Sequence, residues 1–392
     1  MTDVPRPMIY LIAGEESGDR LGGPLMRALC DDLDGEVLFA GIGGPMMTEA
    51  GLNSLFPMQE LSVMGVTEVL PRLPRFIRRI NQTVTDVRTR KPDVLITIDA
   101  PDFCFRVAKK LKGQGIPLVH YVAPTVWAWR PGRAEKVSRF LDHLLALLPF
   151  EPPFFEKHGL ACTYVGHPVL QSGADKGDGS AFRNQHHIPS DTPLLVLLLG
   201  SRAGEVGRLL PIFTEAVEQL HRAIPNLEVL IPTVPATHDQ VLTGTSSLTT
   251  PVHVLKTDQE KYDAFAAADV ALAASGTVAL ELAMAGTPSV IGYKLATLTT
   301  LLARKVVQTP YVNLINIILK REAIPELILE NCVADKLAGA LETLFSTPDA
   351  RAAQKHDYKA ALAILGHGTI SPNKRAAETI RHILQTKTNG AA

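Results

Sequence analysis

Val270-Ala-Leu-Ala-Ala-Ser-Gly-Thr-Val-Ala-Leu-Glu-Leu-Ala-Met-Ala-Gly-Thr-Pro288 contains the three parts of a strand, turn and helix unit. The apolar run from Val270 to Ala274 predicts a short buried strand, and Ser275-Gly276 predicts a tight turn. The helical spacing that follows predicts a helix that begins at Thr277 and stops at Gly286. The unit is typical of an α/β protein, in which ligands gather at the carboxyl ends of the strands.

The predicted start of this helix suits an anion. Its first backbone N–H groups have no partner within the helix, and the helix dipole adds a positive potential that favours a diphosphate. Thr277 adds a hydroxyl donor, and Glu281, one turn later on the same face, would reach the two hydroxyls of a ribose. Because Ser and Thr are also ordinary helix starters, these residues leave a nucleotide site and a plain helix start equally open.

The composition is that of a soluble α/β enzyme with two domains. The 392 residues carry 39 basic and 40 acidic side chains, and this balance argues against a nucleic-acid binder. The four cysteines lack a Cys-x-x-Cys spacing, so we expect no zinc site or disulfide framework, and a reducing cytosol as the compartment. There is no signal-peptide pattern and no apolar run of the roughly 20 residues that span a bilayer.

Strand and helix patterns alternate along the first half. The predicted strand Ile9 to Ala13 is followed by a loop with four polar residues at its carboxyl end, namely Glu15, Glu16, Ser17 and Asp19. Because ligands commonly bind at such an end, these residues are candidates for a substrate-facing loop. The structural alternative is an acidic cluster that starts a surface helix.

A second polar loop follows the apolar strand Asp93 to Asp99. It carries Asp99 and Asp102 with a proline between them. A carboxylate at the end of a central strand is well placed to act as a general base. The alternative is an N-cap for the predicted helix 103–112, a role that Asp102 fits better than Asp99.

Two other stretches of the first half combine apolar or aromatic residues with arginines. The loop 123–133 holds both tryptophans of the chain, flanked by Arg130 and Arg133, and could line a groove for sugar or acyl chains. The segment 61–79 alternates apolar residues with arginines, as a membrane-surface element does. An amphipathic helix packed on the sheet has the same pattern, and the residues alone favour that core helix.

Residues 171–192 have little periodicity and are expected to be a linker between a domain 1–170 and a domain 193–372. After them, the strand Leu194 to Leu199 leads into Gly200-Ser201-Arg202 and a helix, a second predicted anion site with Arg202 at the turn. We therefore expect two Rossmann-like, doubly wound parallel-sheet domains facing one another across a cleft. A closing helix at 373–386 is expected to pack back on the first domain.

The chain resembles the lipid-A-disaccharide synthase family of inverting glycosyltransferases, which have the two-domain GT-B fold. The resemblance covers nearly the whole length through motifs in a specific order. They are Ala13-Gly-Glu-Glu-Ser-Gly-Asp19, Gly41-Ile-Gly-Gly-Pro45, Ile98-Asp-Ala-Pro-Asp-Phe103, Tyr121-Val-Ala-Pro-Thr-Val-Trp-Ala-Trp129, Leu147-Leu-Pro-Phe-Glu151, Tyr164-Val-Gly-His-Pro168, Gly200-Ser-Arg202, Ser275-Gly-Thr277 with Glu281, and Pro310-Tyr-Val-Asn-Leu-Ile-Asn316. Leu199 and Ile315 depart from the family pattern, which commonly has proline at both positions.

The resemblance implies transfer of a diacylglucosamine from UDP-2,3-diacylglucosamine to 2,3-diacylglucosamine 1-phosphate (lipid X), with release of UDP. Asp99 would be the base, and Arg202 would neutralise charge on the diphosphate without a metal or other cofactor. The donor would be held by Gly200, Ser201, Arg202, Ser275, Gly276, Thr277, Glu281 and Asn316. Glu15, Glu16, Ser17 and Asp19 would face the acceptor.

The resemblance also favours the membrane interpretation of the segment 61–79, since both substrates are acylated. The patch would lie on the cytoplasmic leaflet of the inner membrane of a Gram-negative bacterium, on a cytoplasmic protein that is peripherally attached. It comprises Val63, Met64, Val66, Val69, Leu70, Arg72, Leu73 and Arg75. A homodimer is left open. The alternatives are a UDP-N-acetylglucosamine 2-epimerase of the same fold and a non-enzymatic carrier of UDP-lipid.

Overall fold

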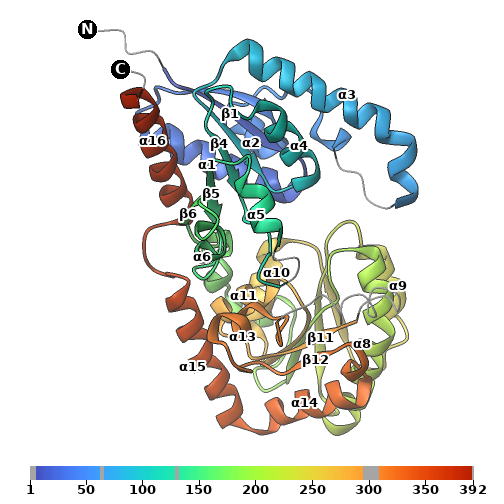
Figure 1. The fold of residues 1–392 in the computed structure, drawn as a ribbon. Helices are drawn as coiled ribbons and strands as arrows, with labels where there is room; N and C mark the ends of the chain where they lie inside the picture. The colour runs from blue at the N-terminus through green and yellow to red at the C-terminus, as the bar shows by residue number, and fades with distance from the viewer. Residues whose placement is uncertain (1–5, 62–65, 129–131, 295–308, 391–392) are drawn as a thin grey trace. The chain divides into compact units, whose positions relative to one another are not determined.

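The computed structural model describes residues 6–61, 66–128, 132–294 and 309–390. Contacts divide the chain into unit 1, which is Met1–Pro168 with Gly368–Ala392, and unit 2, which is Val169–His367. Each unit has its own parallel sheet with helices on its faces (Figure 1).

The sheet of unit 1 has the strand order β2-β1-β3-β4-β5-β6. Its strands are β1 (Met8–Ala13), β2 (Leu38–Ile42), β3 (Val94–Ile98), β4 (Leu118–Tyr121), β5 (His143–Ala146) and β6 (Ala161–Tyr164). Its helices are α1 (Glu16–Asp32), α2 (Pro45–Glu49), η1 (Met58–Glu60), α3 (Val66–Arg90), α4 (Pro101–Leu111), α5 (Gly132–Ser138), α6 (Pro152–Glu156) and α16 (Pro372–Gly390).

The sheet of unit 2 has the order β12-β11-β10-β7-β8-β9. Its strands are β7 (Leu194–Leu198), β8 (Glu228–Pro232), β9 (Val252–Leu255), β10 (Val270–Ala274), β11 (Ser289–Tyr293) and β12 (Glu326–Ile328). Its helices are η2 (Pro168–Gln171, whose first residue belongs to unit 1), η3 (Ala174–Lys176), α7 (Gly179–Gln185), α8 (Ala203–Ala223), α9 (His238–Thr245), α10 (Asp258–Ala267), α11 (Val278–Ala285), α13 (Leu314–Leu319), η4 (Leu329–Asn331), α14 (Ala334–Ser346) and α15 (Pro348–Ile364).

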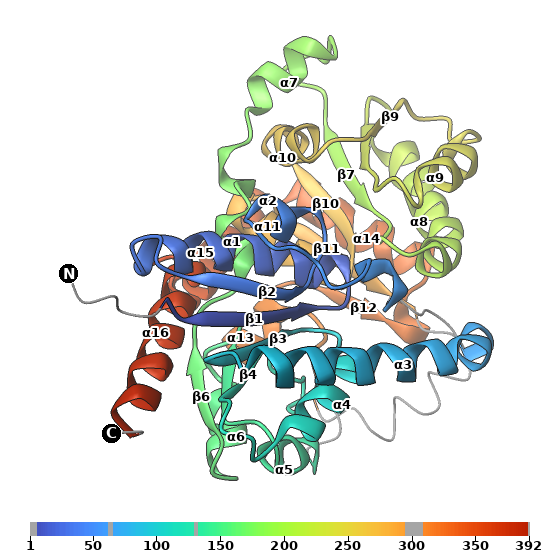
Figure 2. The same cartoon turned by 90° about the horizontal axis from the view of Figure 1, so that it is seen from above.

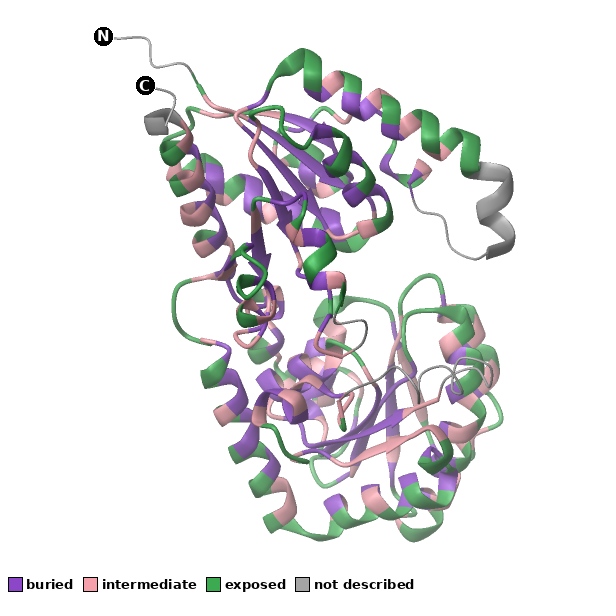
Figure 3. Cartoon of the chain, in the orientation of Figure 1, coloured by how far each residue is buried: buried purple, intermediate pink, exposed green. Residues whose placement is uncertain are grey.

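The central strands form the cores of both units. Every residue of β3 and β7 is buried, and both strands are continuous apolar runs apart from Thr97. A strand covered by helices on both faces has no solvent side, so its sequence loses the polar alternation of an exposed sheet. Figure 3 shows the same contrast, with buried strands and helices that are exposed along one side.

Long helices pack against each other at the outside of unit 1. α16 packs against α1, and α3 packs against α4, as Figures 1 and 2 let the reader follow. Both α3 and α16 come from stretches with apolar residues at helical spacing, which gives each helix one side to bury. The last helix therefore returns to the unit formed by the first part of the chain.

The strands predicted from apolar runs are observed as β1, β3, β7 and β10, but β12 is three half-buried residues long and has no such signal. Residues 171–192, expected to be a linker, contain η3 and α7, and α7 packs against α10. The Asp178 side chain caps α7 by accepting from the Ala181 N–H, so a short helix forms in a stretch without apolar periodicity.

Candidate active site

The strand order of unit 1 reverses between β1 and β3. Along the sheet, β1 pairs with β2 on one side and with β3 on the other, and Ala13 lies beside Ile98. The loops after these two strands therefore start at the same point on the carboxyl edge. In open parallel sheets this reversal leaves a crevice in which ligands bind.

Asp99 and Ser17 meet at this point. The hydroxyl of Ser17, in the first turn of α1, donates to Asp99 Oδ2 at 2.8 Å. The two loops also touch, because a Cβ added to Gly14 would lie 2.6 Å from the Cβ of Ala100. The structure thus brings the predicted base together with one of the four residues predicted to face the acceptor.

The backbone at the ends of β3 and β4 is strained. Asp99, Ala100 and Val122 have φ angles of 49°, 42° and 83°, in the left-handed region that side chains other than glycine rarely adopt. Val122 is β-branched, for which this conformation is least favourable. Strain of this kind persists where the surrounding structure holds it, and it gathers at functional sites.

Neither carboxylate of the Asp99 loop caps α4. The helix begins at Pro101, two residues earlier than expected, and its N-cap is Ala100, which makes no side-chain hydrogen bond. Asp102 is exposed in the first turn of the helix. The N-cap alternative for these two residues is therefore wrong, and the half-buried Asp99 side chain lies at the edge of the sheet.

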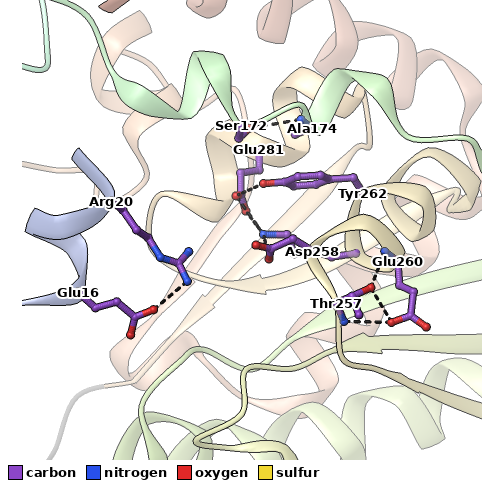
Figure 4. A network of polar contacts seen from close by, with 10 residues as sticks. Glu16, Arg20, Ser172, Ala174, Thr257, Asp258, Glu260, Tyr262 and Glu281 are labelled. Carbon is purple, nitrogen blue, oxygen red and sulfur yellow. Dashed lines mark hydrogen bonds and ion pairs between the residues drawn. The ribbon is translucent and has the colours of Figure 1, made fainter. Parts of the chain in front are cut away.

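Two of the other predicted acceptor-side residues lie at the start of α1. Glu15 is the N-cap residue of the helix and is half-buried. Glu16 is exposed and accepts a hydrogen bond from Arg20 at 3.0 Å, one turn along the helix (Figure 4). A pair between two exposed side chains contributes little to stability, so Glu16 is readily available to another partner.

Asp19 has a structural task instead. Its side chain is 2 % exposed. The carboxylate accepts backbone N–H groups of Gly44, Met46 and Met47 at 2.9 to 3.0 Å, at the start of α2. The prediction that Asp19 faces an acceptor is therefore corrected: the side chain holds the 43–47 loop against α1.

The tryptophan loop is fixed by a buried carboxylate. Glu151 is 2 % exposed and accepts from Trp127 Nε1 at 3.2 Å and from the backbone N–H groups of Leu147 and Leu148 at 3.1 and 2.9 Å. Burial raises the pKa of Glu151 to about 7, against the hydrogen bonds, which favour the charged form. Trp127 also packs edge-on against Phe150. Trp129 and Arg130 lie outside the described residues.

Unit 2 has the same kind of reversal, between β7 and β10. Leu198 pairs with Ala273, so the loop that begins at Gly200 and the loop 275–277 start side by side. They lead into α8 and α11, whose first backbone N–H groups have no partner within their own helix. Ser201, Arg202, Gly276 and Thr277 are exposed there. The geometry places two helix N-termini and a guanidinium at one edge, as an anion site requires.

Gly200 has a conformation that only glycine adopts easily. Its φ is +99°, and an added Cβ would meet the Glu205 carboxylate at 2.2 Å. Glu205 lies in the first turn of α8, and burial raises its pKa while Arg202 lowers it. A carboxylate in this first turn is stabilised by the helix dipole, as a bound anion would be.

Glu281 already has partners within unit 2. Its carboxylate accepts from Lys261 Nζ at 3.1 and 3.3 Å. It also accepts from the Tyr262 hydroxyl at 3.1 Å (Figure 4). Both partners belong to α10, whose start is fixed by a capping box between Thr257 and Glu260. Lys261 and Tyr262 hold Glu281, the residue predicted to bind the ribose, in one orientation. The sequence analysis did not identify these two residues.

The prediction that the Asn316 side chain contacts the donor needs correcting. Its side chain is fully buried, and its amide donates to Ile324 O at 2.8 Å and to Glu326 Oε1 at 2.6 Å. Its carbonyl accepts the backbone N–H groups of Ala323 and Ile324 at 2.8 and 2.9 Å. All four hydrogen-bonding positions of the amide are used, so this side chain braces the loop rather than contacting a donor.

Glu326 is the second residue of this brace. Its carboxylate accepts the backbone N–H groups of Val312 and Asn313 at 2.8 and 2.9 Å. The Val312 carbonyl in turn accepts from Ser275 Oγ at 3.2 Å. The loop 309–313 is therefore tied to the predicted phosphate turn. No local sequence pattern predicts the bracing role of Glu326, because this residue lies in the short strand β12.

The predicted membrane patch is only partly described. Val63 and Met64 lie outside the described residues, whereas Val66, Val69, Leu70 and Arg72 belong to the first turns of α3. Leu73 is 43 % exposed, and Ile77, one turn on, is 47 % exposed. Arg75 and Arg79 bind the Glu60 carboxylate and lower its pKa to about 2.

No helix within the described ranges is long and apolar enough to cross a bilayer.

Comparison with known proteins gives one consistent result. A family described as Lipid-A-disaccharide synthetase matches residues 9–380 of the chain. The chain is 52 % identical to the lipid-A-disaccharide synthase of Rhodospirillum centenum, covering 96 % of this chain and 94 % of that protein. It is 50 % identical to the protein of the same name from Paramagnetospirillum magneticum, over 95 % and 96 % of the two chains.

Among solved structures, the UDP-GlcNAc 2-epimerase of Neisseria meningitidis bound to UDP-GlcNAc is similar in fold. Its TM-score is 0.63 over 97 % of this chain and all of that one, at 12 % sequence identity. A likeness at this identity concerns the fold alone.

Proposed function

The chain belongs to the lipid-A-disaccharide synthase family of glycosyltransferases, and from this premise we propose that Asp99 is the base of its transfer reaction. The donor is UDP-2,3-diacylglucosamine and the acceptor 2,3-diacylglucosamine 1-phosphate. The observation that carries the proposal is the Ser17–Asp99 pair at the strand-order reversal of unit 1. A carboxylate fixed at that edge can receive a proton from a bound hydroxyl.

The proposed step is a single displacement. The 6-hydroxyl oxygen of the acceptor forms a bond to the anomeric carbon of the donor, while the bond from that carbon to the diphosphate oxygen breaks. Asp99 takes the hydroxyl proton, and UDP leaves with the electron pair. Because the nucleophile attacks opposite the leaving group, the configuration inverts.

The leaving diphosphate would be stabilised by unit 2. Arg202 and the N–H groups at the starts of α8 and α11 lie at one exposed edge. Donors fixed in advance at this position favour the charge that develops on the diphosphate, so the proposed reaction needs no metal ion. Ser201, Gly276 and Thr277 would contact the phosphates, and Glu281 would bind the ribose.

The proposal includes attachment to the inner membrane through the start of α3. Exposed Leu73 and Ile77 support it, because apolar side chains on a surface helix lower the free energy of contact with acyl chains. Arg75 is paired with Glu60, so Arg72 and other cations of unit 1 would meet the lipid phosphates.

The test measures UDP release from UDP-2,3-diacylglucosamine with and without the acceptor, for the parent, Asp99→Asn and the matched control Asp102→Asn. We expect acceptor-dependent release that falls about 10²- to 10⁴-fold in Asp99→Asn, the range for loss of a general base. Asp102→Asn should keep the parent rate, and UDP affinity should be the same in all three.

Other outcomes would redirect the proposal. Full activity in Asp99→Asn would move the base to the exposed Glu16. Conversion of UDP-N-acetylglucosamine without any lipid would instead indicate the 2-epimerase alternative, and tight UDP-lipid binding without turnover would indicate a carrier.

A further inference from the structure

The Glu281 carboxylate is largely enclosed by protein. Glu281 belongs to the first turn of α11, where its backbone N–H donates to the Thr277 carbonyl at 3.4 Å. Its side chain is 16 % exposed, so the carboxylate faces mainly other side chains. The contacts that each of its two oxygens already makes therefore decide how many ligand hydroxyls Glu281 can still accept.

One oxygen of the Glu281 carboxylate has two donors. Lys261 Nζ donates to Oε1 at 3.1 Å. The Tyr262 hydroxyl donates to the same oxygen at 3.1 Å and points at the carboxylate in Figure 4. A carboxylate oxygen offers about two positions to donors, so both positions of Oε1 are filled.

The other oxygen has room for a ligand. Oε2 accepts from Lys261 Nζ at 3.3 Å, and the described part of the chain gives it no second donor. The Glu281 carboxylate as a whole is thus left with about one open position. A ribose presents two neighbouring hydroxyls, so one of them finds no acceptor on Glu281.

The Tyr262 hydroxyl is held in its place on Oε1. Tyr262 is buried, and its hydroxyl has a further hydrogen bond with the Ser172 side chain. Burial raises the pKa of the Tyr262 phenol, and the negative charge of Glu281 raises it further, so the hydroxyl keeps its proton at neutral pH. A ligand that used Oε1 would have to break this bond.

Lys261 is held on the same carboxylate. Its Nζ also pairs with Asp258 Oδ1 at 3.5 Å, so three carboxylate oxygens surround an ammonium that has three N–H donors. Burial lowers the pKa of Lys261, but the Glu281 carboxylate and the other neighbours outweigh burial, and the pKa is raised overall. Lys261 therefore stays charged and remains on Glu281.

We infer that Glu281 binds the ribose through Oε2 alone and so recognises one of its two hydroxyls, with Lys261 and Tyr262 as positioning residues that occupy Oε1. The inference rests on the UDP site proposed above in unit 2, and it narrows the contact of Glu281 from two hydroxyls to one. A nucleoside diphosphate that lacks one ribose hydroxyl should therefore bind like UDP, whereas one that lacks the other should bind weakly.

Titration calorimetry of the full chain with UDP, 2′-deoxy-UDP and 3′-deoxy-UDP tests this asymmetry. The three nucleotides share the base and the diphosphate, and each analogue lacks a single hydroxyl. The proteins are the parent, Tyr262→Phe, which opens one position on Oε1, and the matched control Tyr358→Phe. Tyr358 is also a buried tyrosine of unit 2, but its hydroxyl bonds to Thr287 and Ser289 instead of Glu281.

We expect the parent to bind one of the two analogues about 10- to 100-fold more weakly than UDP, the range for a lost hydrogen bond to a charged group. The other analogue should bind within about threefold of UDP. In Tyr262→Phe this tolerated analogue should become about tenfold weaker than UDP, because the second hydroxyl then has an acceptor. Tyr358→Phe should keep both ratios of the parent, and circular dichroism should show all three proteins folded alike.

Two results would overturn the inference and leave the proposed UDP site in place. Large losses for both analogues in the parent would mean that Glu281 holds both hydroxyls. Parent-like ratios in a folded Tyr262→Phe would mean that the tyrosine does not limit the contact.

A third result would contradict the proposed function as well. Tight UDP binding with no loss for either analogue would remove Glu281 from ribose recognition. Because the comparison of the three nucleotides on the parent needs no variant, it decides between one hydroxyl, two and none even if Tyr262→Phe does not fold.

Discussion

Replacing Glu151 by glutamine is expected to lower the stability of the protein slightly at pH 5 and to raise it at pH 8. The parent carboxyl is buried and has a pKa of about 7, whereas the unfolded chain has the ordinary value of 4.5. Below pH 4.5 the carboxyl group is protonated in both the folded and the unfolded state. The difference between the two pKa values then costs the folded protein no stability. As the pH rises towards 7, the unfolded chain loses its proton first, so the parent loses stability.

The size of this loss follows from the two pKa values. A difference of one pH unit corresponds to about 1.4 kcal/mol, so the interval from 4.5 to about 7 gives about 3 kcal/mol. Glutamine does not titrate, but its NH₂ group would face the Trp127 N–H and forfeit that hydrogen bond, worth about 1 kcal/mol. The variant should therefore be slightly less stable than the parent at pH 5 and about 2 kcal/mol more stable at pH 8.

Urea unfolding followed by tryptophan fluorescence measures this difference. Both tryptophans belong to unit 1, so the signal reports the unit that contains Glu151. The difference in unfolding free energy between parent and variant isolates one side chain, because other titrating groups cancel. Glu156→Gln, at an exposed site of α6, serves as the control and should follow the parent. A difference that stays constant from pH 5 to 8, or grows in favour of the parent, would refute the reasoning.

Three further substitutions probe the two sheet edges. Ser17→Ala removes the hydroxyl that binds Asp99 and should lower kcat about tenfold with UDP affinity unchanged, as kinetics and calorimetry would show. Asn316→Ala leaves the N–H groups of Ala323 and Ile324 and the Ile324 carbonyl without their side-chain partner, so urea unfolding of unit 2 should show a loss of about 3 kcal/mol. A loss of unfolding free energy below about 1 kcal/mol would restore the prediction that Asn316 contacts the donor. Gly200→Ala forces a side chain into positive φ against Glu205 and should weaken UDP binding at least about tenfold in calorimetry, whereas unchanged affinity would exclude this turn from the site.

The sequence predicts the fold well because buried parallel strands are local signals. Continuous apolar runs bounded by Gly and Pro identify β3, β7 and β10 without knowledge of their neighbours. The same runs place Asp99 and Arg202 at strand ends. What the runs cannot give is strand order, and so they do not show that the loop of Ser17 adjoins that of Asp99.

The parts of the site that sequence reasoning missed depend on contacts between distant residues. In the sequence, Asp19 cannot be distinguished from its acidic neighbours Glu15 and Glu16. Only the position of the 44–47 backbone shows that three N–H groups donate to the Asp19 carboxylate. Asn316 belongs to a motif of the family, but its exposure depends on Glu326 in a strand too short to predict. Residue type shows which chemistry is available, while packing decides which side chains remain free for it.

The left-handed turn at Asp99 and Ala100 affects any attempt to make the enzyme more thermostable. Glycine at position 100 would relieve about 1 kcal/mol of strain and so raise the melting temperature. The same change would free the backbone that aims the Asp99 carboxylate. Screens that select variants for heat resistance should therefore enrich glycine here at the expense of turnover, so thermostability and catalytic rate are antagonistic at this edge.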